Sequence, residues 1–239
     1  MKKVSELSVF FPAYNEAENI KNTVLEAIKV LNETAQQWEI IVVNDGSKDN
    51  TIAVVNNLIK TNKKIRLVSH QTNKGYGAAI KTGLASARYK LIAHMDSDGQ
   101  FTFAEIVKFL EKINQADLVL GYRFKRIDSL YRRILQKILW LADWILFGLK
   151  VKDIDCGFKL FKKEVVEKIG KLVTESAITE TEFVVRCQKA GFKIIEVRVD
   201  HHPRLDGVQT GGKLKVILKA GIEGLYLWWI LTIKEKQSL

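Results

Sequence analysis

Short apolar runs alternate with longer amphipathic stretches in the first half of the chain. Runs of about five apolar or β-branched residues predict strands, and they lie at Leu7–Pro12, Trp38–Val43, Ile65–Ser69, Leu91–Met95 and Leu118–Gly121. The intervening stretches have helical spacing, and they lie at Ala17–Leu31, Thr51–Thr61, Gly75–Ala87 and Phe103–Gln115. This alternation predicts an α/β fold with a mostly parallel sheet and helices on both faces.

The pattern changes after Gly121. The expected elements are a long helix, a loop leading to a strand, a second helix, a second strand and a helical tail, at Ser129–Leu149, Asp153–Phe161, Thr179–Ala190, Ile194–His201 and Lys213–Lys234. Neither an internal repeat nor a linker rich in proline or serine interrupts the chain. The sequence therefore predicts a single domain over residues 1–239, with halves at 1–125 and 126–239 and amphipathic C-terminal helices.

Three expected helix starts have the spacing of a capping box, in which the first residue and an acidic residue three positions later each accept a backbone N–H. The pairs are Asn15 with Glu18, Thr102 with Glu105, and Thr179 with Glu182. We expect these pairs to cap their helices.

Basic charge is concentrated in the second half. The formal net charge is +11, of which residues 121–239 carry +9. Such a surface suits nucleic acid, anionic lipid or a phosphorylated ligand. Four of the five tryptophans also lie in this half, and they are Trp140, Trp144, Trp228 and Trp229. Tryptophan beside basic residues favours a membrane surface over nucleic acid.

These tryptophans lie in two apolar segments, Ile138–Leu149 and Leu225–Ile233, which are flanked by basic residues. Both are shorter than the roughly twenty residues that span a bilayer. They fit helices in the membrane interface, although core helices or an oligomer contact would share the pattern. Cys156 and Cys187 have no metal-ligand spacing, and we expect reduced thiols. The sequence predicts a peripheral protein on the cytoplasmic face of a membrane, attached directly or through a membrane-protein partner.

Polar residues follow several predicted strands. Ligands of parallel sheets bind at the carboxyl ends of the strands, where this chain carries Asn15-Glu16, Asn44-Asp45-Gly46-Ser47, Asp96-Ser97-Asp98 and Gly121-Tyr122-Arg123. In an extended segment, residues two apart point to one side, so Asp96, Asp98 and Gln100 can converge on one cation. Their oxygens suit Mg²⁺ or Mn²⁺, which would neutralise a departing diphosphate. A solvated acidic turn is the alternative.

The turn at Asp45 and Gly46 supports a second ligand contact. Asp45 can accept hydrogen bonds from a base or a ribose, while Gly46 lets the chain turn sharply. The same residues are common in ordinary turns, and Glu16 is a residue that also favours the start of a helix.

Four motifs together resemble those of the family 2 glycosyltransferases, which have the GT-A fold. They are Phe11-Pro12-Ala13-Tyr14-Asn15-Glu16, Asn44-Asp45-Gly46-Ser47, Asn73-Lys74-Gly75 and Asp96-Ser97-Asp98-Gly99-Gln100. The resemblance covers residues 1–125 and implies inverting transfer from a GDP- or UDP-linked sugar bound by this half. It implies nucleotide-sugar contacts from Pro12, Tyr14, Glu16, Asp45, Lys74 and Asp96. It also implies a Mg²⁺ or Mn²⁺ site at Asp96, Asp98 and Gln100.

The second half is similar to the dolichol-phosphate mannose synthase branch and its bacterial polyprenyl-phosphate relatives. The stretches that carry this similarity are Gly121–Arg123, Asp155–Phe161, His202–Arg204 and Gly207–Gly211. The branch implies a mannose- or glucose-type sugar, a polyprenyl or dolichyl phosphate acceptor, and a second half that faces acceptor and membrane. It further implies that Arg123, Arg133 and Arg204 bind phosphate, and that Asp98, Arg123 and Arg204 are catalytic.

The acceptor decides whether a general base is needed. A phosphate is already anionic, whereas a saccharide or other hydroxyl acceptor would need a base such as Glu180 or Glu182. Of the histidines, His94 fits a core residue, and His201 or His202 could touch phosphate. A non-catalytic nucleotide- or membrane-binding module and a nucleic-acid binder are the remaining hypotheses. The acidic residues at the strand ends argue against both.

Overall fold

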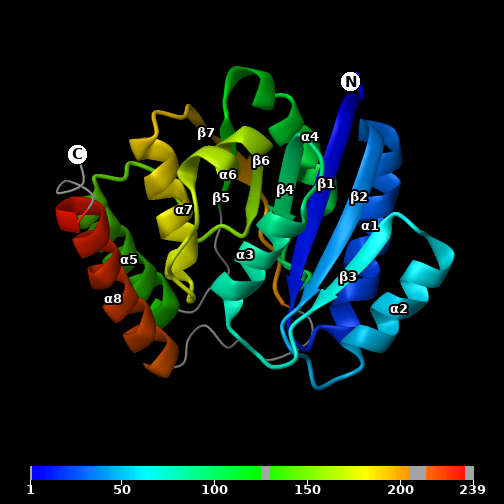
Figure 1. Ribbon diagram of the computed structural model, residues 1–239, viewed down its shortest axis with the longest axis horizontal. Coiled ribbons are helices and arrows are strands. Elements are labelled where there is room, and N and C mark those ends of the chain that lie inside the picture. The colour runs from blue at the N-terminus through cyan, green and yellow to red at the C-terminus, as the bar shows by residue number, and fades with distance from the viewer. Residues whose placement is uncertain (1, 125–129, 205–213, 235–239) are drawn as a thin grey trace.

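A seven-stranded sheet crosses the molecule in the order β3-β2-β1-β4-β6-β5-β7 (Figure 1). The computed structural model describes residues 2–124, 130–204 and 214–234, with the backbone alone at 130–136, 214–218 and 234. The strands are β1 Val4–Ala13, β2 Ala35–Asn44, β3 Ile65–Ser69, β4 Leu91–Met95, β5 Leu118–Arg123, β6 Phe158–Lys162 and β7 Ile194–Val199. Neighbouring strands in the described sheet are parallel except where β6 pairs antiparallel with β4 and β5. The expected α/β fold with a mostly parallel sheet is confirmed.

Helices cover both faces of this sheet (Figure 1). The α-helices are α1 Ala17–Thr34, α2 Thr51–Thr61, α3 Tyr76–Ser86, α4 Ile106–Leu110, α5 Leu130–Phe147, α6 Lys163–Ile169, α7 Ile178–Lys189 and α8 Leu214–Trp229. Two short 3-10 helices flank α4, and a π-helical turn follows α8, at Phe103–Glu105, Ile113–Gln115 and Ile230–Lys234.

Two hydrophobic cores form because the side chains of a strand alternate between its faces. Leu7, Val9 and Phe11 of β1 join the core beneath α1, α2 and α4. Phe10 points the other way, into the core that includes α3, α6 and α7 and residues of α5 and α8. A central parallel strand is buried on both faces, which explains its unbroken apolar sequence. Cys156 and Cys187 are both buried, one in each core.

The predicted helix over Phe103–Gln115 is interrupted. Only Ile106–Leu110 is α-helical, between two 3-10 helices. The buried Phe103, Ile106 and Phe109 are spaced by three residues, and the tighter helix keeps them on the core side. Packing has therefore overridden the simple helical pattern.

The sequence pattern also failed to predict the short helix α6, and it predicted a strand β7 that is longer than the observed one. Helix α6 has only seven residues, too few for a helical period to be recognised. Gly170 stands at its end with φ 70°, a backbone conformation that favours glycine. Strand β7 ends at Val199, two residues before the expected end at His201.

The capping-box prediction for α1 is wrong. Asn15 has φ 56°, and its Oδ1 accepts from the Lys48 amide (2.8 Å). The helix start is satisfied by the loop after β2, because Asp49 Oδ2 accepts from the Ala17 amide (3.0 Å). A tertiary contact thus replaces the local cap.

The other two capping boxes are also absent. Thr102 makes no side-chain cap, and Glu105 Oε2 accepts from the Asp200 amide instead (2.9 Å). Helix α7 begins at Ile178, so Thr179 lies inside it. Glu182 is fully buried, and its carboxylate accepts from the amides of the preceding loop and from the Arg186 guanidinium (2.8 Å). Glu105 thus joins segments that are distant in sequence, whereas Glu182 holds the loop immediately before its own helix.

Candidate active site

The carboxyl ends of β1, β2 and β4 lie at one edge of the sheet. Ser97 Oγ donates to the Pro12 carbonyl (2.6 Å), which ties the turn after β4 to the end of β1. Strand β6 begins at the same edge, where the Asp96 amide donates to the Gly157 carbonyl (3.0 Å). Motifs from both halves of the sequence therefore meet at this edge.

The Asp96 carboxylate fits tightly against the start of β6. A Cβ at position 157 would lie 1.9 Å from Asp96 Oδ2, so any larger residue there would force the carboxylate to shift. Asp96 Oδ1 accepts from the Tyr76 hydroxyl (2.8 Å). Burial favours the neutral acid, but the neighbouring His94, Tyr76 and Lys159 lower the pKa of Asp96. The side chain keeps 28% of its surface exposed, so it can still reach a ligand.

Arg204 joins acidic residues from two strand ends. Its Nη1 lies 3.4 Å from Asp98 Oδ2, and its Nη2 donates to Glu16 Oε1. Glu16 Oε2 also accepts from Asn19 Nδ2 (2.8 Å). Burial and the charge of Asp96 raise the pKa of Asp98 to about 6, and burial raises the pKa of Glu16. Arg204 thus brings together acidic groups from the ends of β1 and β4, and it compensates only part of their charge.

Gln100 connects the segment after β7 to the turn that carries Asp96 and Asp98, called the acidic turn below. The backbone N–H of Gln100 donates to Asp98 Oδ1 (3.1 Å), and its side-chain Nε2 donates to the His202 carbonyl (3.1 Å). The His202 amide donates back to the Gln100 carbonyl (2.9 Å), and His202 Nε2 lies 3.3 Å from Thr102 Oγ1. These contacts bring Arg204 to Asp98 across the sequence.

The loop after β3 encloses Asp45. Its Oδ1 accepts from the Lys74 amide (2.9 Å) and lies 2.7 Å from His70 Nδ1, while Oδ2 accepts from the Gly75 amide (2.9 Å). Lys74 contributes its backbone here, and its side chain is exposed. His70 Nε2 also contacts Thr82 Oγ1 (2.9 Å). Sequence reasoning missed His70, because a single histidine after a strand has no distinctive spacing.

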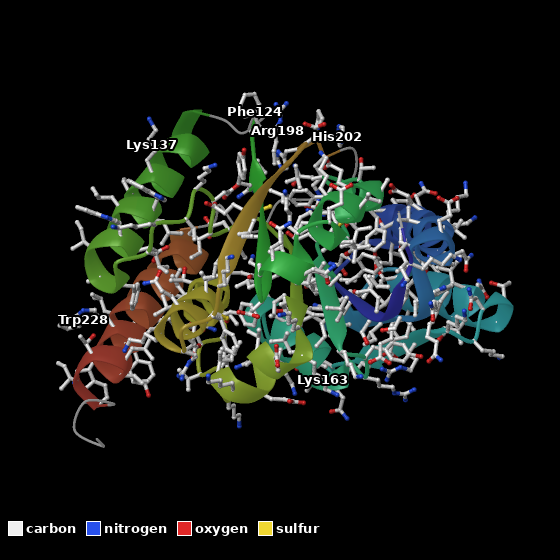
Figure 2. All side chains as sticks on the ribbon, turned by 90° about the horizontal axis from the view of Figure 1, so that it is seen from above. Phe124, Lys137, Lys163, Arg198, His202 and Trp228 are labelled. Carbon is white, nitrogen blue, oxygen red and sulfur yellow. The ribbon has the colours of Figure 1, made fainter. Side chains whose placement is uncertain are left out.

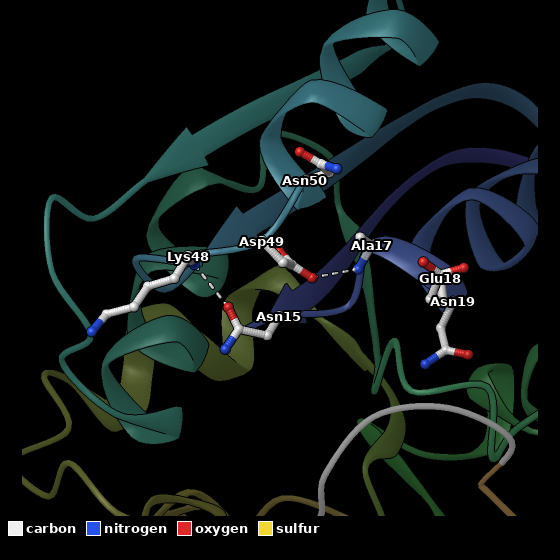
Figure 3. Close-up of a pocket in the computed structure, with 7 residues that line it drawn as sticks. All are labelled: Asn15, Ala17, Glu18, Asn19, Lys48, Asp49 and Asn50. Carbon is white, nitrogen blue, oxygen red and sulfur yellow. Dashed lines mark hydrogen bonds between the residues drawn. The ribbon is translucent and has the colours of Figure 1, made fainter.

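A polar pocket of about 370 Å³ lies beside the end of β1 (Figure 3). The turn before α1, the first residues of α1 and the loop after β2 line it, through Asn15, Ala17, Glu18, Asn19, Lys48, Asp49 and Asn50. Figure 3 shows the hydrogen bond from the Lys48 amide to Asn15 that joins the two segments. Pro12 is buried at the end of β1, and Tyr14 is half-buried in the turn that follows.

The three predicted phosphate-binding arginines lie in different surroundings. Arg123 forms a bidentate pair with Asp153, from Nε to Oδ2 (2.7 Å) and from Nη2 to Oδ1 (2.8 Å). Burial opposes its charge, but this carboxylate raises the pKa of Arg123 and keeps it protonated. Arg133 lies on α5 among the residues whose side chains are outside the described structure. Of the two arginines whose side chains the structure describes, Arg123 pairs with Asp153, and Arg204 contacts the acidic turn at Asp98.

Glu180 lies behind the acidic turn, in a buried polar cluster. Its Oε2 pairs with Lys159 Nζ (2.7 Å), and its Oε1 lies 3.1 Å from the Tyr76 hydroxyl. His94 stacks on Phe10 with ring centroids 4.9 Å apart, consistent with its expected place in the core. The sequence singled out neither Lys159 nor Tyr76, because a lysine inside an apolar strand and a tyrosine opening a helix are not distinctive on their own.

The donor chemistry of the acidic turn fits a hard divalent cation. Asp96 and Asp98 present carboxylate oxygens at partly exposed positions, with crowded negative charge that a cation would relieve. In the described part of the chain, no three His, Cys, Asp or Glu side chains form a ready-made metal site.

Comparison with known proteins identifies the family. Residues 8–170 match the profile described as Glycosyl transferase family 2. A dolichyl-phosphate beta-glucosyltransferase of Trichomonas vaginalis is 32% identical, with 94% of this chain and 73% of that protein covered. One of Dictyostelium discoideum is 33% identical, with 81% and 65% covered. The crystal structure of glucosyl-3-phosphoglycerate synthase from Mycobacterium tuberculosis with Mn²⁺ and UDP-glucose has a TM-score of 0.69 at 18% identity, covering 94% and 79%.

The structural match concerns the fold, and it identifies the sheet and its helices as the GT-A fold. The profile match extends from β1 to the end of α6, so it includes the end of β2, the turn after β4 and the start of β6. The chain therefore belongs to glycosyl transferase family 2 and is a glycosyltransferase of the hexosyltransferase class.

Proposed function

We propose that this enzyme transfers a mannose- or glucose-type sugar from a nucleoside diphosphate to a polyprenyl or dolichyl phosphate, with inversion. The main support is the meeting of the acidic turn, Arg204 and the loop before β6 at one edge of the sheet. The two relatives named as dolichyl-phosphate beta-glucosyltransferases support the acceptor and favour glucose. Both halves, residues 1–125 and 126–239, contribute to the proposed single domain.

The donor nucleotide lies, in this proposal, along the ends of β1 and β2. Pro12, Tyr14, Glu16, Asp45 and Lys74 contact it, beside the polar pocket of Figure 3. The structure of the Mycobacterium tuberculosis relative with UDP-glucose favours a UDP-linked donor over a GDP-linked one.

Asp96, Asp98 and Gln100 hold Mg²⁺ or Mn²⁺ in this proposal. The Mn²⁺ in the same relative's structure supports a divalent cation. When bound, such a cation neutralises the charge that builds on the departing nucleoside diphosphate. Gln100 would use its side-chain oxygen, because its Nε2 already donates to the backbone.

Arg123, Arg133 and Arg204 orient the acceptor phosphate in the proposed reaction. An acceptor oxygen attacks the anomeric carbon as the bond from that carbon to the donor phosphate oxygen breaks. No general base is needed, because a phosphate monoester is mostly anionic at neutral pH. Catalysis then rests on positioning and charge neutralisation by Asp98, Arg123 and Arg204. Glu180 and Glu182, the bases considered for a hydroxyl acceptor, are both enclosed, which disfavours either of them in that role.

Exposed apolar residues on α5 and α8 support binding of the enzyme to a membrane surface. Both helices lie at one end of the molecule, and Figure 2 shows Lys137 and Trp228 on that side. The exposed apolar residues are Ile138, Trp140, Leu141, Trp144, Ile145, Ile222, Leu225, Tyr226 and Trp229. Among the described residues, no helix is long and apolar enough to cross a bilayer. We propose peripheral attachment to the cytoplasmic face, directly or through a membrane-protein partner.

Transfer of radiolabelled sugar from UDP-glucose, GDP-mannose and UDP-N-acetylglucosamine to polyprenyl phosphate tests the function. We expect Mn²⁺- or Mg²⁺-dependent label in the organic phase, lost with chelator and in Asp98→Ala. Label that appears only on a soluble saccharide would contradict the lipid-phosphate acceptor. Release of free sugar alone would contradict transfer to either acceptor.

A further inference from the structure

Lys159 is a fully buried cation beneath the acidic turn. It lies on β6, and only 1% of the surface of this lysine is exposed. Its Nζ pairs with Glu180 Oε2 (2.7 Å) and donates to the Cys156 carbonyl (2.6 Å), with the Ile154 carbonyl at 3.4 Å. Burying a lysine is costly unless the charge is paired and hydrogen-bonded, so this geometry marks a constrained position.

One arm of this cluster leads from Lys159 to Asp96. The Tyr76 hydroxyl lies 2.8 Å from Asp96 Oδ1 and 3.1 Å from Glu180 Oε1, but it has one hydrogen to donate. Pairing with Lys159 compensates the charge of Glu180, which leaves the hydroxyl hydrogen for the closer Asp96. His94 also contacts this cluster, with Nε2 at 3.3 Å from the Tyr76 hydroxyl oxygen and 3.7 Å from Asp96, and Nδ1 at 3.5 Å from Glu180.

A second arm leads from Lys159 to the loop before β6. The carbonyls of Ile154 and Cys156 hold this loop on the lysine. The same loop carries Asp153, which binds Arg123, and Gly157, whose carbonyl binds the Asp96 amide. A single ammonium group is therefore connected to both sides of the site.

We propose that Lys159 is a positioning residue. It holds the Asp96 carboxylate through Glu180 and Tyr76, and it holds the Asp153–Gly157 loop through two carbonyls. The assignment of these two sides to cation and acceptor rests on the proposed function. The cation-binding arm can be tested on its own, without any acceptor.

Lys159→Met tests the first arm by Mn²⁺ titration of the purified protein with UDP present. Without Lys159, the Glu180 carboxylate competes for the Tyr76 hydrogen, and we expect Mn²⁺ affinity to fall about tenfold or more. Lys159→Met with Glu180→Gln removes that competition, so Mn²⁺ affinity should recover most of the loss. The matched control is Lys162→Met, on the same strand and paired with Asp117, which should change affinity less than about twofold.

The second arm predicts a different result for the acceptor. The double variant still lacks the bonds to the two carbonyls, so KM for polyprenyl phosphate should stay raised while Mn²⁺ affinity recovers. Thermal unfolding checks that each variant is folded. If Lys159→Met does not fold, Tyr76→Phe carries the test of the first arm, with weaker Mn²⁺ binding expected at an unchanged unfolding temperature.

Unchanged Mn²⁺ affinity in folded Lys159→Met, or in Tyr76→Phe when the lysine variant is unfolded, would overturn the proposal. Parallel loss and parallel recovery of Mn²⁺ and acceptor binding would show a purely structural role. If the wild-type enzyme fails to use polyprenyl phosphate but the Mn²⁺ pattern holds, the proposed acceptor fails and the role of Lys159 towards Asp96 stands.

Discussion

Asp98 is an acid whose surroundings oppose its ionised form. Burial and the charge of Asp96 raise its pKa to about 6, and Arg204 offsets part of that effect. Between pH 3.8 and about 6, the folded, metal-free protein therefore holds a proton on Asp98 that the unfolded chain has released. The excess of acidic charge around Asp98, which Arg204 compensates only in part, is a cost to folding that a bound cation would reverse.

Mn²⁺ affinity should fall as pH decreases through about 6, because protonated Asp98 is a poor ligand. Titrations between pH 5 and pH 8 measure this, with Asp98→Asn as the reference that binds weakly throughout.

The stability of the metal-free protein should change with pH in the opposite direction to Mn²⁺ affinity. Without metal, ionisation of Asp98 destabilises the fold as pH rises from 3.8 to about 6. Asp98→Asn should therefore stabilise the metal-free protein at pH 7 by about 1–2 kcal/mol in urea denaturation. Affinity independent of pH over this range would contradict the role given to Asp98.

Gly157→Ala should displace the Asp96 carboxylate, because the new Cβ would lie 1.9 Å from Oδ2. Misplacement of a reacting group by about 1 Å costs on the order of a hundredfold in rate, and we expect a loss of this size in sugar transfer. The control is Gly221→Ala on α8, where an added Cβ meets nothing within 4 Å. Transfer by Gly157→Ala at the wild-type rate would show that Asp96 needs no fixed position.

At the scale of elements, the start of α1 depends on a loop from another part of the sequence. The Ala17 amide donates to Asp49 Oδ2, and the Glu16 amide donates to Thr51 Oγ1 (2.9 Å). Asp49 Oδ1 also accepts from the Thr51 amide (3.0 Å), so one short loop serves the starts of both α1 and α2. The polar pocket lies against these residues, and helix capping and pocket shape are thereby coupled.

Asp49→Ala should destabilise the protein by about 1 kcal/mol, the usual cost of a lost helix cap. Glu18→Ala tests the alternative local cap, and it should change stability by less than about 0.5 kcal/mol. Urea denaturation of both variants at neutral pH makes the comparison. A larger loss in Glu18→Ala than in Asp49→Ala would restore the capping box that the sequence suggested.

At the scale of the whole molecule, α5 and α8 place apolar side chains in solvent at one end. Ile145 and Leu225 keep 64% and 62% of their surface exposed, although both helices also contribute to the core behind them. Large exposed apolar patches on soluble proteins mark interaction surfaces. The basic charge of the second half suits anionic lipid as the partner.

Ile145→Glu combined with Leu225→Glu should reduce co-sedimentation with anionic phospholipid vesicles about tenfold or more, since each buried apolar side chain contributes about 1.5–3 kcal/mol. Nucleotide binding should be unchanged. Leu25→Glu, at an exposed apolar position on α1, serves as the control. Unchanged vesicle binding by the double variant, with a shift from dimer to monomer in gel filtration, would favour an oligomer contact on this face.

Local pattern was enough to predict most of the strands, the long helices and the acidic turn, because side-chain periodicity and turn chemistry act between near neighbours. The GT-A expectation rested on four motifs and is confirmed by the profile match and the fold. Tertiary structure alone decided that β6 runs antiparallel between β4 and β5, that Arg204 reaches Asp98, and that Lys159 lies buried beneath Asp96. These arrangements depend on charge compensation and packing between segments up to 106 residues apart, which no local spacing records.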